Sequence, residues 1–476
     1  MRVVRVGFGL MALVVGVVGL RGGAQQKGLA VTPPMGWNSW DAYGLTITEE
    51  QFRANVDVLV SKLKPAGYQY AVIDEGWFFE NPQDRPAPEK LIYDLDRYGR
   101  YVPYVGRFPS AITTMTVAPA IYDGSHPESP KYIARVGDSS FAELGKWVHG
   151  QGLKFGIHIV RGIPRASVER NISIEGSAFH AQDAADQGDA CPWDPTNWGV
   201  KNDAAGQAWY DSLMRQYAAW GVDLIKVDCI SSHPYKVDEI RMIRRAIDKT
   251  GRPMVLSLSP GPTALENAAE VGGLAQMWRI SDDVWDVWSS TEKWPRTVKS
   301  QFETTAAWAK YSKAGNWPDA DMLPVGVLGP VPGWGKARTS RLTHDEQRTL
   351  VTLWAIARSP LIVGANLTEL DDWTAALLTN PTVIAMDQRG HDEKMARQDE
   401  DWIVWTSKGD GGKEYLAVFN VGDAQARVAL PLGRYGFAPG EKYSARDVWE
   451  GKDLGKISEA TGVVAAHGVL LLELKK

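Results

Sequence analysis

The chain has 476 residues, and its 52 Lys and Arg against 57 Asp and Glu give a net charge of −5 at pH 7. With 44% hydrophobic and 23% charged residues, the composition is that of a globular protein and excludes the disordered, collagen-like and coiled-coil classes. The mild acidity excludes the basic surface of a nucleic-acid-binding protein, and 2 Cys with 8 scattered His suit neither a disulfide scaffold nor a structural zinc site.

The first 24 residues have the pattern of an export signal. Arg2 and Arg5 precede an apolar run at residues 6–20, and a short segment ending in Ala24 follows. The run is shorter than the ~20 apolar residues that a membrane span needs. We therefore expect a signal peptide over residues 1–24 and a mature protein exported to the periplasm or the extracellular space, free of the membrane. The alternative is a retained anchor.

Short apolar runs alternate with helical patterns between residues 31 and 362. Continuous apolar runs separated by helices are typical of parallel strands that are buried on both faces. Eight such strands are expected, at residues 35–37, 70–73, 155–160, 224–227, 254–258, 277–280, 317–320 and 361–363. The clearest helical stretches are residues 49–63, 141–149, 208–220 and 237–247. This pattern predicts an α/β fold, a (β/α)8 TIM barrel over residues 25–390.

Two regions depart from the alternating pattern. Residues 78–130 are rich in Pro, Asp and Tyr, and we expect a long loop there, between the second and third barrel strands. After residue 389, short strands separated by Gly, Asp and Pro indicate an antiparallel β-sandwich over residues 391–476. The strands expected in it are residues 402–405, 415–420, 427–432, 443–448 and 469–474.

Polar side chains end six of the eight expected barrel strands. They are Asp74 and Glu75, His158, Lys226 and Asp228, Ser259, Asp282 and Asp283, and Asp319 and Asp321. A single polar group at such a place is commonly a helix cap, but barrel enzymes carry their active sites at the C-terminal ends of the strands. The 20 Trp add flat faces that either fill a core or stack on sugar rings. The strand ends therefore predict a functional rim.

The fourth expected strand is the most informative. Its period of two puts Lys226 and Asp228 on the face opposite Ile225 and Val227. The apolar pair suits the helix layer, so the charged pair should face the barrel mouth, where the ammonium would keep the carboxylate ionised as a nucleophile requires. A buried structural ion pair is the alternative. With a second carboxylate from residues 282–283, two carboxyls about 5–5.5 Å apart would suit a retaining glycosidase.

Six segments spread over the chain form a set of motifs in a fixed order. They are Thr-Pro-Pro-Met-Gly-Trp-Asn-Ser-Trp at 32–40, Ile-Asp-Glu-Gly-Trp at 73–77, Lys-Val-Asp at 226–228, Trp-Arg-Ile-Ser-Asp-Asp at 278–283, Asp-Ala-Asp-Met-Leu at 319–323 and Leu-Trp-Ala-Ile-Ala-Arg-Ser-Pro-Leu at 353–361. This set resembles glycoside hydrolase family 27, which contains α-galactosidases, α-N-acetylgalactosaminidases and β-L-arabinopyranosidases. The resemblance covers the whole mature chain, including the sandwich tail.

The resemblance implies two catalytic carboxylates. Asp228 corresponds to the family's nucleophile and Asp283 to its general acid/base. Asp283 is preferred to Asp282 because the family's acid stands four residues after the arginine of the sixth strand, here Arg279.

Five further positions correspond to the family's sugar-binding residues. Trp40 resembles the aromatic wall beside the reacting sugar. Asp74 corresponds to a carboxylate that binds the 4- and 6-hydroxyls of galactose, and Lys226 to a donor for the 3- and 4-hydroxyls. Arg279 and Asp321 correspond to binders on the 2-hydroxyl side.

Three substrate-pocket positions and the cysteines depart from the family's pattern. Glu75 replaces the second Asp of a pair, and its extra methylene could fill the place of the galactose C6 hydroxymethyl and favour L-arabinopyranose. His158 stands where Tyr is common. Ser259 stands where galactosidases often have Glu, which resembles the roomier 2-position pocket of the N-acetylgalactosaminidases. Cys191 and Cys229 either bridge at the pocket edge or remain two free thiols.

The resemblance implies a retaining exo-glycosidase that hydrolyses terminal α-D-galactosides of oligo- or polysaccharides, without metal or organic cofactor. The alternatives within the family are a β-L-arabinopyranosidase and an α-N-acetylgalactosaminidase. A catalytically silent carbohydrate-binding protein is the alternative from another class, but it should have lost a carboxylate, and both Asp228 and Asp283 remain. The sequence leaves open whether the chain forms a homo-oligomer.

Overall fold

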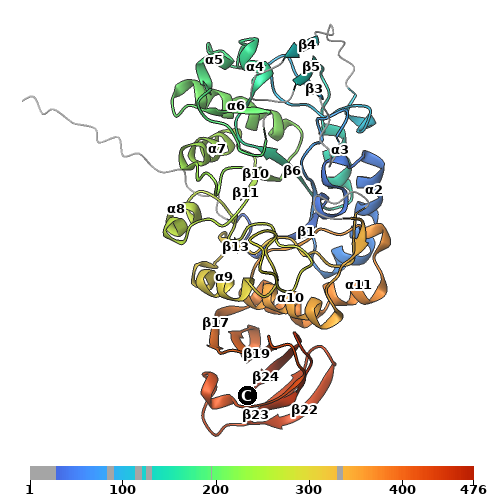
Figure 1. The fold of residues 1–476 in the computed structure, drawn as a ribbon, viewed down its shortest axis with the longest axis vertical. Helices are drawn as coiled ribbons and strands as arrows, with labels where there is room; N and C mark the ends of the chain where they lie inside the picture. The colour runs from blue at the N-terminus through green and yellow to red at the C-terminus, as the bar shows by residue number, and fades with distance from the viewer. Residues whose placement is uncertain (1–27, 83–89, 113–120, 125–130, 195, 330–335) are drawn as a thin grey trace, which may run out of the picture.

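The computed structural model describes residues 28–476 except 83–89, 113–120, 125–130, 195 and 330–335 (Figure 1). The expected signal peptide, residues 1–24, lies outside the described residues. Among the helices that are described, none combines the length and the apolar character needed to cross a membrane.

Eight parallel strands form one curved sheet in the order β13-β12-β11-β10-β6-β2-β1-β16. They are β1 (Met35–Asn38), β2 (Tyr70–Ile73), β6 (Lys154–Val160), β10 (Leu224–Asp228), β11 (Val255–Leu258), β12 (Met277–Arg279), β13 (Trp317–Asp319) and β16 (Leu361–Val363). The sheet closes where Leu323, after β13, forms a parallel bridge with Val363 of β16. All eight expected strands are therefore confirmed, and the sheet is that of a (β/α)8 barrel.

Helices surround the barrel sheet (Figure 1). They are α1 (Trp40–Tyr43), α2 (Glu49–Val58), α3 (Ala142–Gly150), α4 (Arg165–Glu169), α5 (Ala181–Ala184), α6 (Ala204–Ala219), α7 (Val237–Thr250), α8 (Ala268–Gly272), α9 (Gln301–Trp308), α10 (His344–Ala357), α11 (Asp372–Leu378) and α12 (Pro381–Arg389). In α7, Ile240, Ile243 and Ile247 recur at helical spacing and are fully buried. Gly251 ends this helix with a φ of 70°, a conformation that glycine adopts at little cost.

The long loop expected over residues 78–130 contains secondary structure that the sequence analysis did not predict. The region contributes β3 (Lys90–Leu95) and β4 (Ile121–Gly124), which pair with β5 (Lys131–Val136) in the order β3-β5-β4. Tyr93 is fully buried and lies at 5.4 Å from the ring of Tyr101 and 5.6 Å from that of Tyr132. The tyrosines that suggested a loop therefore form an aromatic core of their own, which stabilises the small sheet.

Five short strands lie between the barrel elements in the described part of the chain. The pairs are β7 (Ile163–Pro164) and β8 (Ala185–Asp186), which flank β9 (Asn197–Val200), and β14 (Val327–Leu328) with β15 (Arg338–Thr339).

The C-terminal part contains a six-stranded antiparallel sheet in the order β17-β18-β19-β24-β21-β22 and a two-stranded sheet of β20 and β23. The strands are β17 (His391–Gln398), β18 (Trp402–Lys408), β19 (Lys413–Asn420), β20 (Ala426–Pro431), β21 (Tyr443–Asp447), β22 (Lys452–Ile457), β23 (Glu459–Val464) and β24 (Val469–Lys475). A buried apolar cluster that includes Val404, Leu416 and Leu472 fills its interior. The ring of Phe419 packs at 4.9 Å on Phe302 of α9, which joins this sandwich to the barrel.

Candidate active site

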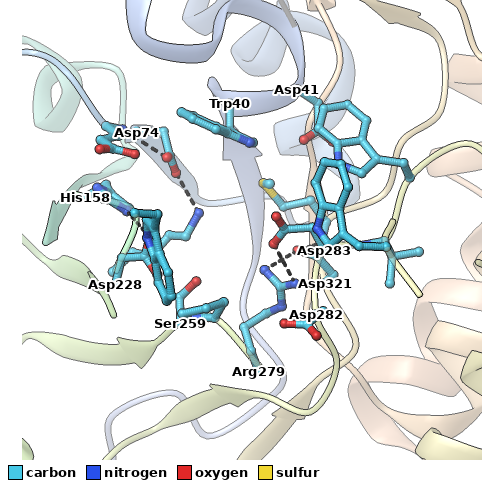
Figure 2. A pocket seen from close by; sticks show the side chains of 18 of the residues that line it. Trp40, Asp41, Asp74, His158, Asp228, Ser259, Arg279, Asp282, Asp283 and Asp321 are labelled. Carbon is cyan, nitrogen blue, oxygen red and sulfur yellow. Dashed lines mark hydrogen bonds and ion pairs between the residues drawn. The ribbon is translucent and has the colours of Figure 1, made fainter. Parts of the chain in front are cut away.

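A cavity of ≈ 310 Å³ lies at the C-terminal ends of the barrel strands (Figure 2). Every site residue that the sequence analysis selected lines it: Trp40, Asp74, Glu75, His158, Lys226, Asp228, Ser259, Arg279, Asp283 and Asp321. Parallel strands end at the same edge of a sheet, and this common edge brings together residues that are far apart in the sequence. Asp282 also lines the cavity.

The alternation predicted for residues 224–228 is confirmed. Lys226 and Asp228 line the cavity, whereas Ile225 and Val227 are fully buried in the core beneath the helices. Leu224, on the face of Lys226, belongs to the small cluster that fills the barrel interior below the cavity.

The partner of Lys226 differs from the expected one. Its Nζ lies 2.8 Å from Oδ2 of Asp74, and Nδ2 of Asn38 donates to the same oxygen at 2.7 Å. Burial acts to raise the pKa of Asp74, but the Lys226 ammonium outweighs it and holds that pKa well below its usual range. Asp74 is therefore an anion that presents acceptors at one end of the cavity, and Lys226 is a cation beside it.

Asp228 owes its ionisation mainly to His158. Nε2 of His158 lies 3.6 Å from Oδ2 of Asp228, and the backbone N–H of Cys229 donates to Oδ1 at 2.7 Å. Burial opposes ionisation, but the nearby His158 side chain, followed by the Lys226 charge, lowers the pKa of Asp228. The expected effect of Lys226 on Asp228 is confirmed in direction, but it is smaller than that of His158, and the Lys226 ammonium is bound to Asp74 at the end of β2, on the other side of β6.

His158 is fixed within the barrel wall. It is buried in β6, opposite Lys226 in the strand register, and its carbonyl accepts a 2.8 Å hydrogen bond from the indole N–H of Trp77. Burial acts to lower the pKa of His158, but Asp74 and Asp228 raise it overall. The surrounding carboxylates therefore favour the charged form of the imidazole.

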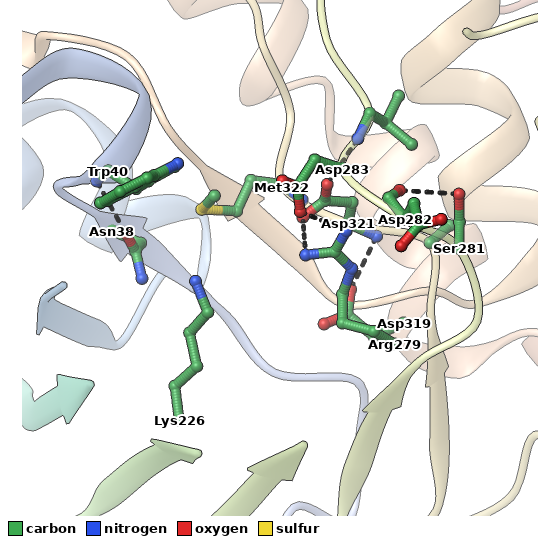
Figure 3. A network of polar contacts seen from close by, with 12 residues as sticks. Asn38, Trp40, Lys226, Arg279, Ser281, Asp282, Asp283, Asp319, Asp321 and Met322 are labelled. Atoms are coloured by element: carbon green, nitrogen blue, oxygen red, sulfur yellow. Dashed lines mark hydrogen bonds and ion pairs between the residues drawn. The ribbon is translucent and has the colours of Figure 1, made fainter. Parts of the chain in front are cut away.

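A second group of charges lies on the other side of the cavity (Figure 3). Arg279 binds Asp321 at 2.8 Å and Asp283 at 3.2 Å. The Asp321 side chain is 4% exposed but that of Asp283 is 40% exposed, so Asp283 is the carboxylate that an incoming ligand can reach. Asp321 also accepts from the backbone N–H of Val284 at 2.7 Å. Burial raises the pKa of Asp321 to about 7, against the charge of Arg279.

Glu75 lies near Asp228 and has a pKa far above that of an ordinary glutamate. Burial raises the pKa of Glu75 to about 8, partly offset by the charge of His158. Ligand atoms of Glu75, His158 and Asp228 lie within 4.8 Å of one another, so these three residues could hold a metal ion.

The structure adds residues to the cavity that the sequence analysis did not select. They are Asp41, Trp193, His233, Pro260, Val284, Trp285, Trp294 and Met322. Asp41 follows Trp40 directly, which was its one signal. It is 2% exposed, and burial raises the pKa of its carboxyl well above the usual range. The tryptophans stand in loops, where no periodicity marks them.

Cys191 and Cys229 form a disulfide with a Cα–Cα distance of 6.0 Å. Of the two alternatives left open by the sequence, the structure shows the bridged one. Because Cys229 directly follows Asp228, the bond ties the loop after β8 to the strand end that carries this carboxylate.

Comparisons with known proteins agree over nearly the whole chain. Residues 202–389 match the family model "Alpha galactosidase A" and residues 399–474 match "Alpha galactosidase C-terminal beta sandwich domain". A GH27 β-L-arabinopyranosidase structure from Geobacillus stearothermophilus is 39% identical, with a TM-score of 0.81 and 94% of this chain and 97% of that chain covered. The α-galactosidase of Cyamopsis tetragonoloba is 26% identical, over 93% of this chain and 86% of the relative. α-Galactosidase A of Cellvibrio japonicus is 26% identical over 98% of both chains.

Proposed function

The chain belongs to glycoside hydrolase family 27, and from this premise we propose that it hydrolyses terminal α-D-galactosides of oligo- or polysaccharides with retention of configuration. The observation that carries the proposal is that one cavity contains a half-buried Asp228, whose pKa is lowered, and a half-exposed Asp283 together with the Asp74–Lys226 pair. The first two groups supply the chemistry, and the pair supplies the recognition of hydroxyls.

The two carboxylates divide a double displacement between them. In the first step, Asp228 attacks the anomeric carbon while Asp283 gives its proton to the departing glycosidic oxygen, and a glycosyl ester of Asp228 forms. In the second step, Asp283 takes a proton from water, which attacks the anomeric carbon and releases Asp228. The low pKa of Asp228 keeps it ionised for the attack.

The remaining charged groups suit a sugar with an axial 4-hydroxyl. Asp74 offers acceptors and Lys226 offers donors at adjacent positions, so that one hydroxyl of the sugar can bond to both. The indole of Trp40 lies at the wall of the same cavity (Figure 2), where it can cover the apolar face of the ring. Arg279 and Asp321 are then available to bind the 2-hydroxyl, which is next to the reacting anomeric carbon.

A second candidate substrate is the β-L-arabinopyranoside. Galactose and L-arabinopyranose in this configuration differ only at the C6 hydroxymethyl, and Glu75 places an extra methylene in the cavity where galactosidases have Asp. The 39% identical relative from Geobacillus stearothermophilus is a β-L-arabinopyranosidase. Ser259 supports the α-N-acetylgalactosaminide as a third substrate, because a small residue leaves room beside the 2-position.

We also propose that residues 1–24 are a cleaved signal peptide and that the enzyme acts outside the cytoplasm. Arg2, Arg5 and the apolar run at 6–20 support this. N-terminal sequencing of the secreted protein should begin at Gln25, whereas recovery of residue 1 in a membrane fraction would show a retained anchor.

The nitrophenyl glycosides of the three sugars test the proposed substrate. We expect the purified enzyme to have its highest kcat/KM on the α-D-galactoside, with the β-L-arabinopyranoside second. A higher kcat/KM on the arabinopyranoside would make the enzyme a pentosidase. No turnover of any of the three would support the non-catalytic alternative.

A further inference from the structure

Two tryptophans at the cavity differ from the others in their exposure to solvent. Trp193 is 45% exposed and Trp294 is 42% exposed, and both line the cavity. All other tryptophans in the described part of the chain are buried or half-buried. Exposed indoles are unfavourable in water. Two of them at the opening of one cavity therefore indicate that they bind a ligand.

The disulfide fixes Trp193 near the end of β10. Cys191, two residues before Trp193, is bonded to Cys229, which is the neighbour of Asp228. On its other side, Asp194 is buried and its Oδ1 accepts from the backbone N–H of Thr196 at 2.6 Å. Trp193 is therefore held between two anchored residues, with its ring left in solvent.

Trp294 is fixed in a corresponding way beside Asp283. The backbone N–H of Arg296, two residues after Trp294, donates to the carbonyl of Asp283 at 2.8 Å. The backbone N–H of Trp285 donates to the carbonyl of Arg296 at 3.3 Å, and this second hydrogen bond closes the loop. Pro295, the residue after Trp294, is buried. One exposed indole is thus anchored next to each of the two carboxylates of the proposed reaction.

We propose that Trp193 and Trp294 form the subsite for the leaving group and that this subsite takes a pyranose ring of a carbohydrate chain. The inference rests on the proposed function. The reacting sugar occupies the inner part of the cavity among buried Asp74, His158 and Arg279, so the leaving group lies at the open side. Asp283 protonates the oxygen that joins the two sugars, and Trp294 lines the same cavity from a loop that is hydrogen-bonded to the backbone of Asp283.

The chemistry of the two rings matches that ligand. A pyranose presents C–H groups on its faces, and an indole covers them with a rigid apolar plane that loses little conformational entropy on binding. A leaving group without a ring, such as methoxide or fluoride, cannot make this contact. The subsite should therefore favour oligosaccharides and add nothing to the cleavage of galactosyl fluoride.

The test compares two substrates in three variants, Trp193→Ala, Trp294→Ala and the double variant. Each single variant should lower kcat/KM on an α-1,6-linked galactosyl-glucose disaccharide by about tenfold, the usual effect of losing one aromatic contact. On α-galactosyl fluoride, kcat/KM should stay within about twofold, because this glycosylation step involves no leaving sugar. Trp193→Phe and Trp294→Phe should restore most of the disaccharide activity. Phe179→Ala is the matched control, since Phe179 is 36% exposed but does not line the cavity.

Two results would overturn the subsite. Unchanged kcat/KM on the disaccharide would show that the indoles do not contact the leaving group. An equal loss on both substrates would show that they support the fold or the reacting sugar instead. If the unaltered enzyme hydrolyses neither substrate, the proposed function fails, and the subsite fails with it.

Discussion

Nε2 of His158 lies 3.6 Å from the Oδ2 atom of Asp228, so an imidazole, and not the ammonium of Lys226, lies beside the proposed nucleophile. Lys226, two residues before Asp228 on the same strand, is bound to Asp74 instead. His158 therefore contributes most to lowering the pKa of Asp228, with a smaller contribution from Lys226, whereas Lys226 and Asp74 form the pair proposed to bind the sugar.

The first prediction concerns pH. Replacing His158 by Phe removes the side chain that does most to lower the pKa of Asp228 against the effect of burial. The pKa of Asp228 should then rise, and because protonated Asp228 cannot attack, the acidic limb of kcat/KM should move to higher pH, by about one unit. The measurement is the pH profile of kcat/KM on an activated aryl galactoside.

The control for this profile is His149→Phe. His149 also binds a carboxylate, with its Nε2 2.7 Å from Oδ2 of Asp223, but it does not line the cavity. Its replacement should leave the acidic limb in place. An unmoved limb in His158→Phe would mean that His158 does not set the ionisation of Asp228.

The second prediction separates the two adjacent carboxyls Asp282 and Asp283. Both line the cavity, and burial raises the pKa of Asp282, a property that also suits an acid. Arg279, however, binds Asp283. We expect Asp283→Ala to lose most activity on glycosides with poor leaving groups and much less on activated aryl glycosides, which need little protonation. The same substitution at Asp282 should have the smaller effect, and the opposite order would assign the acid to Asp282.

The third prediction concerns the choice of sugar. Shortening Glu75 to Asp removes the methylene that we expect to crowd the C6 hydroxymethyl, and a misfit of this size is worth about 10–200-fold in kcat/KM. Glu75→Asp should therefore raise the ratio of kcat/KM for the α-galactoside to that for the β-L-arabinopyranoside, mainly by a gain on the galactoside. Glu75→Gln keeps the length and serves as the control for charge.

This ratio is decisive for the second candidate substrate. If Glu75→Asp leaves it within about twofold, the side chain does not select between hexose and pentose. The arabinopyranoside then loses the main support that the pocket itself gives it.

The sequence predicts the parts of this site that depend on local pattern. Alternation along one strand places Lys226 and Asp228 on the same face, because successive side chains point to opposite sides of a strand. Burial on both faces makes the barrel strands continuous apolar runs, so that even a strand as short as β16 (Leu361–Val363) is recognisable.

Contacts between distant strands are beyond such patterns. Lys226 binds Asp74 because β10 and β2 both pair with β6, which sets the distance between their ends, and no spacing along the chain encodes it. The polar composition around Tyr93 indicated a loop, whereas the segment belongs to a small sheet whose tyrosines pack on one another. Trp193 and Trp294 lie in loops, where position depends on a disulfide and on single backbone hydrogen bonds.

Rescue of Asp228→Asn by azide tests the central claim most directly, because it asks whether Asp228 forms the covalent bond to the sugar. The variant should lose nearly all turnover of an activated α-galactoside, and azide should restore it by attacking from the face that Asp228 vacates. The account predicts β-galactosyl azide as the product, identified by its anomeric proton signal. An α-azide, or a variant that keeps even about a tenth of the original rate without azide, would contradict the assignment of Asp228 as the nucleophile of a retaining hydrolase.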